Sequence, residues 1–378
     1  MARTVWEYIE RPRGAIMIRA WGEEECVTVP EKLGGRPVVE IGPYAFSAAE
    51  LPRRFQVDEA ERKQTITGEG NLNNIQITGS RLQKIRLPDW VEAIGDYAFY
   101  GCRELKEIAF SDSVLRIGSG AFMGCAGVDR LEFTQRGRGN NSLYQMLSEL
   151  RYAMEIRVRQ GEKEQVLVVP EYYESSVENI PARILELHYQ GTGYGYRQCF
   201  RGKAVDYRGY DRLFGLAKSQ EPSEVLAELA YSRLKYPEGL SEEAKKMYLE
   251  WFSSAVWEAG EYFLKRDNLE AVRLICEAGG FDGMAEHKGR GRSAGENRKV
   301  LADGAGDFYM ASMGEHVLGE EKAEGDGRQE NGGRERPRPA LDILMEMAGR
   351  MGRTEILSCL MDYCHRKLGG RKKKVFEL

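Results

Sequence analysis

The residues with the clearest potential for ligand chemistry lie between Gly191 and Lys203, where glycines alternate with tyrosines and arginines follow. Glycines let a backbone approach a phosphate closely, and arginines can neutralise the charge of that phosphate. No Gly-Lys-Ser/Thr sequence follows, and the spacing differs from that of a dinucleotide-binding fingerprint. The pattern therefore favours an aromatic-rich loop after a helix, with a nucleotide- or phosphate-binding site as the alternative. The candidate ligand residues are Gly193, Tyr194, Tyr196, Arg197 and Arg201.

Two further groups of side chains have types that could react or bind a metal. Cys199 and His188 can be drawn as a nucleophile and its base, but such pairs arise by chance in any chain of this length. Cys359, Cys364 and His365 fall within one predicted helix, where the two cysteines do not share a face and no second cluster supplies ligands. We therefore predict that the protein is not an enzyme and holds no metal or cofactor.

The elements that must position any site are organised by a repeat that spans residues 82–133. The apolar positions of three successive copies are Leu82, Ile85 and Leu87, then Leu105, Ile108 and Phe110, then Val128, Leu131 and Phe133. The period is 23 residues (105 − 82), which is typical of a leucine-rich solenoid. Cys102 and Cys125 occupy the same position of successive turns, which favours small buried side chains over a disulfide or a metal.

The repeat resembles the BspA-type (treponemal) leucine-rich repeats of bacteria. The residues that carry the resemblance run from Leu87 to Cys102 and return from Ser111 to Cys125. An earlier copy is visible from Val38 to Phe46, and the match covers residues 26–133. The resemblance implies a solenoid fold and a role in protein recognition, which in this family is often exerted at bacterial surfaces.

Charged side chains on the outside of the predicted sheet form two rows, because residues alternate between the two faces of a strand. The first row is Lys84, Glu107 and Arg130, and the second is Arg86, Ala109 and Glu132. Opposite charges are neighbours in the first row, so they stabilise cross-strand pairs by roughly 0.2–1 kcal/mol each. The rows form no stripe of one sign, which fits a solvated or docking surface better than a ligand site. All of these residues except the alanine make up the candidate protein-binding surface.

The overall charge and hydropathy exclude several classes of protein. The formal net charge is −4, whereas a general nucleic-acid binder needs an excess of Lys and Arg. No apolar run reaches the length of a membrane span, and the first ten residues include acidic side chains where a secretory signal needs apolar ones. We therefore expect a cytoplasmic protein that binds neither nucleic acid nor membranes.

The N-terminal part of the chain predicts a solenoid with a cap at each end. Residues 1–140 comprise the solenoid and a β-rich N-terminal cap, in which segments 15–21 and 26–29 form a hairpin. Residues 141–175 are predicted as a helix followed by a β-hairpin, which act as the second cap and connector.

The remaining chain predicts helices around one polar insertion. Residues 176–285 are expected to form an α-helical domain whose first helix spans 176–190. Residues 286–339 are rich in Gly, Glu and Arg and cannot bury enough apolar surface to offset the entropy of ordering, so we expect a disordered insertion. Residues 340–378 are predicted as a pair of helices with a basic tail.

Segments 268–279 and 352–362 each look like the second helix of an ankyrin repeat, although the Thr-Pro-Leu-His opening of that repeat is absent. The sequence thus predicts an α+β fold, a short leucine-rich-repeat solenoid with a small parallel sheet followed by a mostly helical domain. We expect a protein–protein interaction module or scaffold whose partner is a protein. A cell-surface adhesin-like protein is the second alternative.

Overall fold

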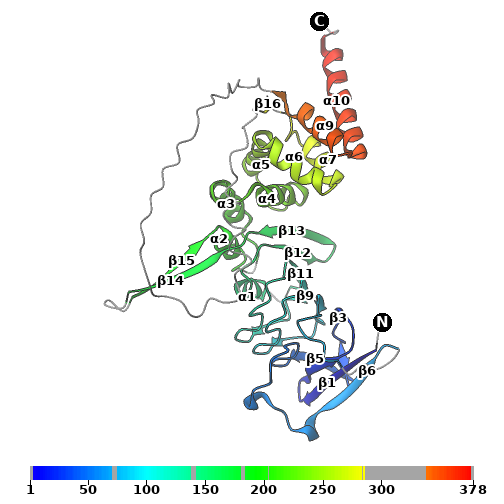
Figure 1. The fold of residues 1–378 in the computed structure, drawn as a ribbon, viewed down its shortest axis with the longest axis vertical. Coiled ribbons are helices and arrows are strands. Elements are labelled where there is room, and N and C mark those ends of the chain that lie inside the picture. The colour runs from blue at the N-terminus through cyan, green and yellow to red at the C-terminus, as the bar shows by residue number, and fades with distance from the viewer. Residues whose placement is uncertain are drawn as a thin grey trace, which may run out of the picture. The chain divides into compact units, whose positions relative to one another are not determined.

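The computed structural model describes residues 3–69, 75–137, 142–179, 184–202, 204–282, 284–285 and 338–375. The chain divides into two compact units, Met1–Glu221 with Glu228–Lys246, and Pro222–Ala227 with Met247–Leu378. Both large sheets belong to the first unit, and the second is mainly helical (Figure 1). The predicted α+β fold, a leucine-rich-repeat solenoid followed by a mostly helical region, is confirmed. The insertion predicted at 286–339 lies outside the described residues, apart from its last two positions.

The first sheet of the solenoid has six strands in the order β13-β12-β11-β9-β7-β3. Neighbouring strands from β3 to β12 are parallel, and equivalent residues of successive turns lie side by side, as the repeat requires. The predicted hairpin of β12 and β13 is confirmed, and it continues this sheet. The strands are β3 (Cys26–Thr28), β7 (Lys84–Arg86), β9 (Glu107–Ser111), β11 (Arg130–Thr134), β12 (Met154–Gln160) and β13 (Lys163–Val169).

The second sheet has seven strands in the order β10-β8-β5-β2-β1-β6, with β4 paired to β5. The hairpin predicted between segments 15–21 and 26–29 is wrong, because β2 and β3 belong to different sheets. β2 instead pairs with β1 across a turn at Pro12 and Arg13, a position that suits proline. The strands are β1 (Thr4–Arg11), β2 (Gly14–Trp21), β4 (Lys32–Leu33), β5 (Arg36–Ile41), β6 (Lys63–Thr67), β8 (Ala93–Ile94) and β10 (Arg116–Ile117).

A column of phenylalanine rings fills the interior of the solenoid. The ring centroids of Phe46 and Phe99 are 5.1 Å apart, and those of Phe99 and Phe122 are 5.0 Å apart. Cys102 and Cys125 are buried and free, and their thiols donate to the backbone carbonyls of Phe46 and Phe99. The predicted structural role of these cysteines is thus confirmed.

The chain that follows the solenoid differs from the prediction in one segment. α1 (Ser142–Glu149) forms as predicted, but the helix expected at 176–190 is an antiparallel pair of strands, β14 (Tyr173–Asn179) and β15 (Ile184–Gln190). Pro181 explains the error, because a proline inside a helix removes a hydrogen bond and clashes with the preceding turn. The helices α2 (Gly193–Gln198), α3 (Tyr207–Gln220) and α4 (Ser223–Lys235) follow.

The rest of the described chain is helical apart from two short strands. Ala255 separates α5 from α6, and α7 is capped by Asn268, whose side chain accepts from Ala271 N–H. The predicted pair of C-terminal helices is confirmed, and Gly352 turns the chain between them. The elements are α5 (Glu242–Ser254), α6 (Val256–Lys265), α7 (Leu269–Glu277), β16 (Met284–Ala285), β17 (Arg338–Pro339), α9 (Ala340–Arg350) and α10 (Thr354–Val375).

Candidate interaction surfaces

The outer side of the six-stranded sheet carries a network of charged side chains, which we call the charged face. Lys84 Nζ lies 3.1 Å from Glu107 Oε2, and a guanidinium nitrogen of Arg130 lies 3.3 Å from the same oxygen. Arg86 reaches past the alanine of β9 to Glu132, at 2.9 Å. The predicted pairing of neighbouring charges is confirmed. The charged face consists of Lys84, Arg86, Glu107, Arg130, Glu132, Glu155, Arg157, Arg159 and Glu164.

Two strands that the sequence predicted as a cap extend the charged face. Because β12 pairs in parallel with β11, Glu155 lies beside Arg130, with 3.8 Å between their charged groups. Arg159 lies 3.5 Å from Glu132 and 3.2 Å from Glu164. Sequence reasoning missed these residues because the repeat ends before β12. The alternation of charged and apolar residues along β12 was the signal that could have found them.

The cations and the carboxylates of the charged face differ in exposure. The side chains of Glu107 and Glu132 are 14% and 17% exposed, whereas those of Lys84, Arg86 and Arg130 are 49%, 52% and 44% exposed. Desolvation works to raise the pKa of Glu107, but hydrogen bonds and charges from Lys84 and Arg130 outweigh it and hold that pKa below its usual value. The carboxylates of Glu107 and Glu132 are therefore recessed, and the neighbouring groups that reach solvent are positive.

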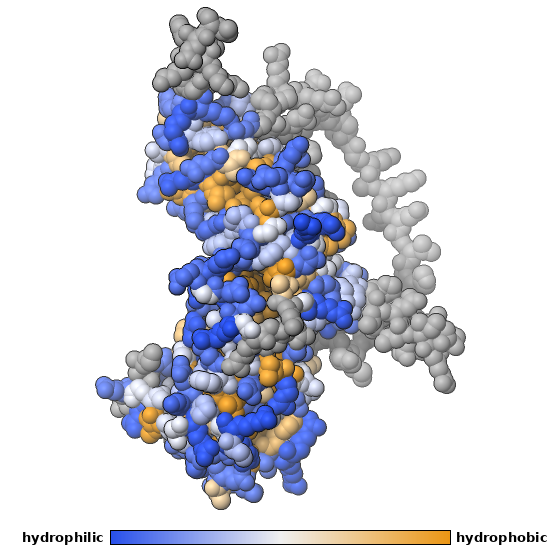
Figure 2. All heavy atoms as spheres, turned by 180° about the vertical axis from the view of Figure 1, so that it is seen from behind, coloured by the Kyte–Doolittle hydropathy of each residue, from blue (hydrophilic) through white to orange (hydrophobic). Residues whose placement is uncertain are grey.

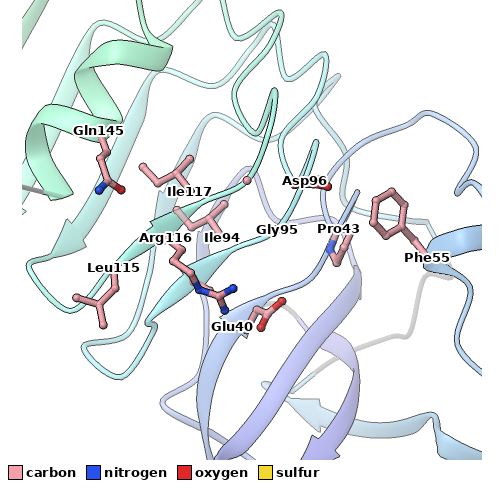
Figure 3. A pocket seen from close by; sticks show the side chains of 12 residues that line it. Glu40, Pro43, Phe55, Ile94, Gly95, Asp96, Leu115, Arg116, Ile117 and Gln145 are labelled. Carbon is pink, nitrogen blue, oxygen red and sulfur yellow. The ribbon is translucent and has the colours of Figure 1, made fainter.

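The seven-stranded sheet carries a hollow of about 520 Å³, which we call the Glu40 hollow (Figure 3). Glu40 of β5, Ala93 of β8 and Arg116 of β10 occupy one row across three parallel strands. Ala93 is only 5% exposed, and its small side chain forms the floor between the two charged ones. Figure 3 shows the Glu40 and Arg116 side chains next to each other, with Leu115 on one side of them and Phe55 on the other.

Glu40 is a half-buried carboxylate that forms no hydrogen bond or ion pair with any residue of the described ranges. Desolvation raises its pKa above the usual value, and the positive charge of Arg116 opposes this increase only in part. Arg116 itself is exposed and lies beyond ion-pair distance of Glu40. Glu40 and Arg116 are therefore opposite charges that do not pair with each other, whereas the third charged residue of the lining, Asp96, accepts a hydrogen bond from the Ser119 backbone N–H at 3.0 Å.

Aromatic residues continue from the hollow along the edge of the solenoid. The ring centroids of Phe55 and Tyr44 are 5.8 Å apart, and those of Tyr44 and Tyr97 are 5.2 Å apart. Tyr44 and Tyr97 have φ angles of 55°, and Gly120 in the equivalent position of the next turn has a φ of 60°. A left-handed conformation costs a side chain about 1–2 kcal/mol relative to glycine, so these tyrosines keep the aromatic contact despite backbone strain.

The candidate ligand loop does not form an open site. Gly193 begins α2, and Tyr196 and Arg197 are at most 2% exposed. The Arg197 guanidinium donates to backbone carbonyls that precede and follow the hairpin of β12 and β13 in the sequence. These belong to Leu147, Leu150, Tyr152, Pro170 and Gly193, at 2.6–3.2 Å. Arg197 therefore anchors α1 and α2 to that hairpin, and a phosphate from solvent cannot reach it. Burial lowers the pKa of Arg197 to about 10 despite the opposing effect of Tyr172, so its guanidinium stays protonated at neutral pH.

The other candidate residues of this loop lie apart from Arg197. Tyr194 stacks on Tyr189, with 3.9 Å between ring centroids, and Arg201 is exposed. The structure thus does not bring the two arginines together.

The remaining candidates for chemistry have ordinary structural roles where they can be described. Burial, followed by the charges of Asp206 and Asp211, raises the pKa of Cys199 to about 12, which leaves its thiol protonated at neutral pH. In the described part of the chain no three His, Cys, Asp or Glu side chains are placed to hold a metal ion. No described helix combines the length and the hydropathy needed to cross a membrane.

The parallel strands of successive turns and the short segments that connect them define a leucine-rich-repeat solenoid. Residues 71–152 match the family described as the BspA type leucine rich repeat region, in 6 copies. The resemblance inferred from the sequence is confirmed for this part of the chain. The ankyrin-like resemblance of the later helices is supported by none of the matches and stays a prediction.

Two solved structures are similar to this chain. A leucine rich cell surface protein from Faecalibacterium prausnitzii is 18% identical, with 41% of this chain and 41% of that chain covered and a TM-score of 0.23. A leucine rich repeat protein from T. pallidum is 23% identical, with 34% of this chain and 68% of that chain covered and a TM-score of 0.19. The match thus spans less than half the length of the F. prausnitzii protein. No curated protein matches the sequence.

Proposed function

We propose that this chain is a non-enzymatic protein-interaction module whose charged face binds an acidic region of a partner protein. The observation that carries the proposal is the contrast between recessed carboxylates and exposed cations on that face. Arginine has five N–H donors and lysine has three. A partner carboxylate can therefore approach Lys84, Arg86 or Arg130 without removing them from Glu107 and Glu132.

The surface of the solenoid supports recognition by charge. On the face that Figure 2 shows, hydrophilic side chains predominate, with hydrophobic patches of different sizes between them. Protein interfaces that depend on apolar contact need a contiguous patch of several hundred Å². Complementary charges instead favour specificity and rapid association, which suits an interaction module.

Affinity purification from the native cells after chemical crosslinking tests the proposal. The variant combines Lys84→Gln, Arg86→Gln and Arg130→Gln, which removes three cations of the charged face. The control combines Lys32→Gln, Arg53→Gln and Arg103→Gln, which removes three exposed cations elsewhere on the solenoid. We expect the intact chain and the control to retain the same acidic partner and the face variant to lose it. Equal recovery with all three proteins contradicts the proposal.

The salt dependence of binding gives a second readout. Screening shortens the range of charge interactions from about 10 Å at 0.1 M salt to about 3 Å at 1 M. Affinity for the partner is therefore expected to fall steadily with added salt. An affinity that does not change with salt points to an apolar interface and away from the charged face.

The compartment is a separate part of the proposal. The F. prausnitzii protein is described as a cell surface protein. We propose the cytoplasm as the location. Cell fractionation with antibody detection of the chain tests this, and recovery in the surface fraction contradicts it.

A further inference from the structure

The Glu40 hollow holds two oppositely charged side chains that each lack a partner among the described residues. Among the described residues, the Glu40 carboxylate accepts no hydrogen bond, and the Arg116 guanidinium donates none and forms no ion pair. A carboxylate that is partly removed from water without a donor raises the free energy of the folded state. A ligand that supplies the missing donor would remove this cost.

The charged face shows that an arginine has the reach to close such a gap. Arg86 bridges to Glu132 across the alanine of an intervening strand, at 2.9 Å. Glu132 is also held from its other side by Arg159, at 3.5 Å. The residue beside Glu40 on the next strand is the apolar Ile16, so Glu40 has no second cation to orient its carboxylate. The two rows thus share a pattern of residues but differ in whether the pair is closed.

The rest of the hollow is lined by apolar side chains together with Asp96 and Gln145. Leu115 is 49% exposed, and Pro43 and Phe55 line the hollow with it (Figure 3). The volume of about 520 Å³ falls within the range of roughly 300–1,000 Å³ that is usual for small-molecule sites. A ligand with an apolar body and two small charged groups matches this lining.

We propose that the Glu40 hollow binds a zwitterionic group, with an ammonium against the Glu40 carboxylate and a carboxylate against the Arg116 guanidinium. The apolar part of the ligand then lies against Pro43 and Phe55, which are neighbours in the hollow (Figure 3). Guanidinium and carboxylate form strong, paired hydrogen bonds, which fixes the orientation of the ligand. A free α-amino acid with an apolar side chain supplies this chemistry, and so does a partner peptide with neighbouring basic and acidic side chains. This site lies on the seven-stranded sheet and does not rest on the proposed role of the charged face.

Isothermal titration calorimetry of the full chain with four probes tests the proposal. L-Leucine carries both charges, L-leucinamide carries only the ammonium, and N-acetyl-L-leucine carries only the carboxylate. The peptide acetyl-Lys-Leu-Glu-amide carries both charges on side chains. We expect leucine or the peptide to bind, and each singly charged leucine derivative to bind about tenfold more weakly than leucine if leucine is the ligand. Binding of leucine alone identifies a free amino acid as the ligand class, and binding of the peptide alone identifies a segment of a partner protein.

Variants of the two charged residues connect the binding to the hollow. Glu40→Gln is expected to weaken leucine about tenfold and to leave N-acetyl-leucine unchanged, because that probe has no ammonium. Arg116→Gln is expected to weaken leucine and to leave leucinamide unchanged. If the peptide is the ligand, both variants weaken it. Arg103→Gln and Glu104→Gln, which change exposed charges elsewhere on the solenoid, serve as controls and leave all affinities unchanged.

Two results would overturn the proposal. One is that neither leucine nor the peptide binds, as expected if Arg116 closes onto Glu40 in solution. The other is an affinity that is the same in both hollow variants as in the unaltered chain. Neither result affects the charged face, whose variants and partner are different.

Discussion

Each sheet of the solenoid contains a row in which a glutamate and an arginine flank an alanine. On the six-stranded sheet, Arg86 and Glu132 form an ion pair of 2.9 Å across the alanine of β9. On the seven-stranded sheet, Glu40 and Arg116 flank Ala93 in the same way but stay beyond ion-pair distance. Identical residue types at equivalent spacing therefore give a closed pair on one sheet and an open pair on the other.

Neighbouring residues therefore decide whether a glutamate and an arginine form an ion pair more than the two residues themselves do. Glu132 has a second cation, Arg159, on the adjoining strand, whereas Glu40 has Ile16 there. A carboxylate held by two cations has a fixed position. Glu40, beside an apolar residue, is desolvated with only partial compensation from the charge of Arg116, and burial raises its pKa accordingly. We therefore expect the loss of stability on removing a charged side chain to increase with the number of groups that it bonds.

The largest effect is expected at Arg197, whose guanidinium bonds five backbone carbonyls. Arg197→Ala leaves several buried carbonyls without a donor, so we expect it to lower the free energy of unfolding of the first unit by roughly 3–5 kcal/mol. Native-state amide hydrogen exchange in β12 and β13 measures this change. Arg201→Ala, an exposed arginine a few residues away, is the control and is expected to change it by less than about 0.5 kcal/mol.

A smaller loss is expected at Glu107, which has two cationic partners on the charged face. Glu107→Gln removes both ion pairs and is expected to destabilise the solenoid by about 1 kcal/mol at neutral pH. Because the pKa of Glu107 is lowered in the folded state, the stabilisation is present above the usual glutamate pKa and is lost as pH falls through the lowered value. Hydrogen exchange of solenoid amides at neutral and acidic pH checks this. A penalty that is equal at both pH values contradicts the role of the ion pairs.

At Glu40 the sign of the effect is expected to reverse. Glu40→Gln removes a desolvated charge that has no donor, so it is expected to stabilise the solenoid by a few tenths of a kcal/mol at neutral pH. Since the pKa of Glu40 is raised in the folded state, the cost of the ionised carboxylate exists above that raised value and disappears below the usual glutamate pKa. The gain should therefore vanish on acidification. A loss of stability at neutral pH would show instead that Arg116 pairs with Glu40.

The solenoid and its charged face could be predicted from the sequence because a fixed period sets both the core and the register. Once Phe99 and Phe122 are known to stack, Lys84, Glu107 and Arg130 must lie side by side. The extension of that face over β12 was missed, because β12 lies beyond the repeat. Its parallel pairing with β11 depends on the segment between the two strands, which does not follow the 23-residue period.

The Glu40 hollow could not be predicted for a related reason. Glu40 and Ala93 are 53 positions apart (93 − 40), which is not a multiple of the 23-residue period. They become neighbours only because residues between them, Phe55 included, do not follow the repeat. Arg197 was misread because an arginine in a glycine-rich segment suggests a phosphate site. Its partners are backbone carbonyls, which carry no sequence signature.

The most direct test of the contrast between the two faces is a carboxyl-carbon NMR titration of Glu40 and Glu107 in the same sample of the full chain. Glu40 is expected to titrate above the usual pKa of a glutamate, because Arg116 offsets the effect of burial only in part, and Glu107 is expected to titrate below it, because Lys84 and Arg130 outweigh burial. A pKa for Glu40 at or below that of Glu107 would contradict the account, since it would mean that the open pair is closed in solution.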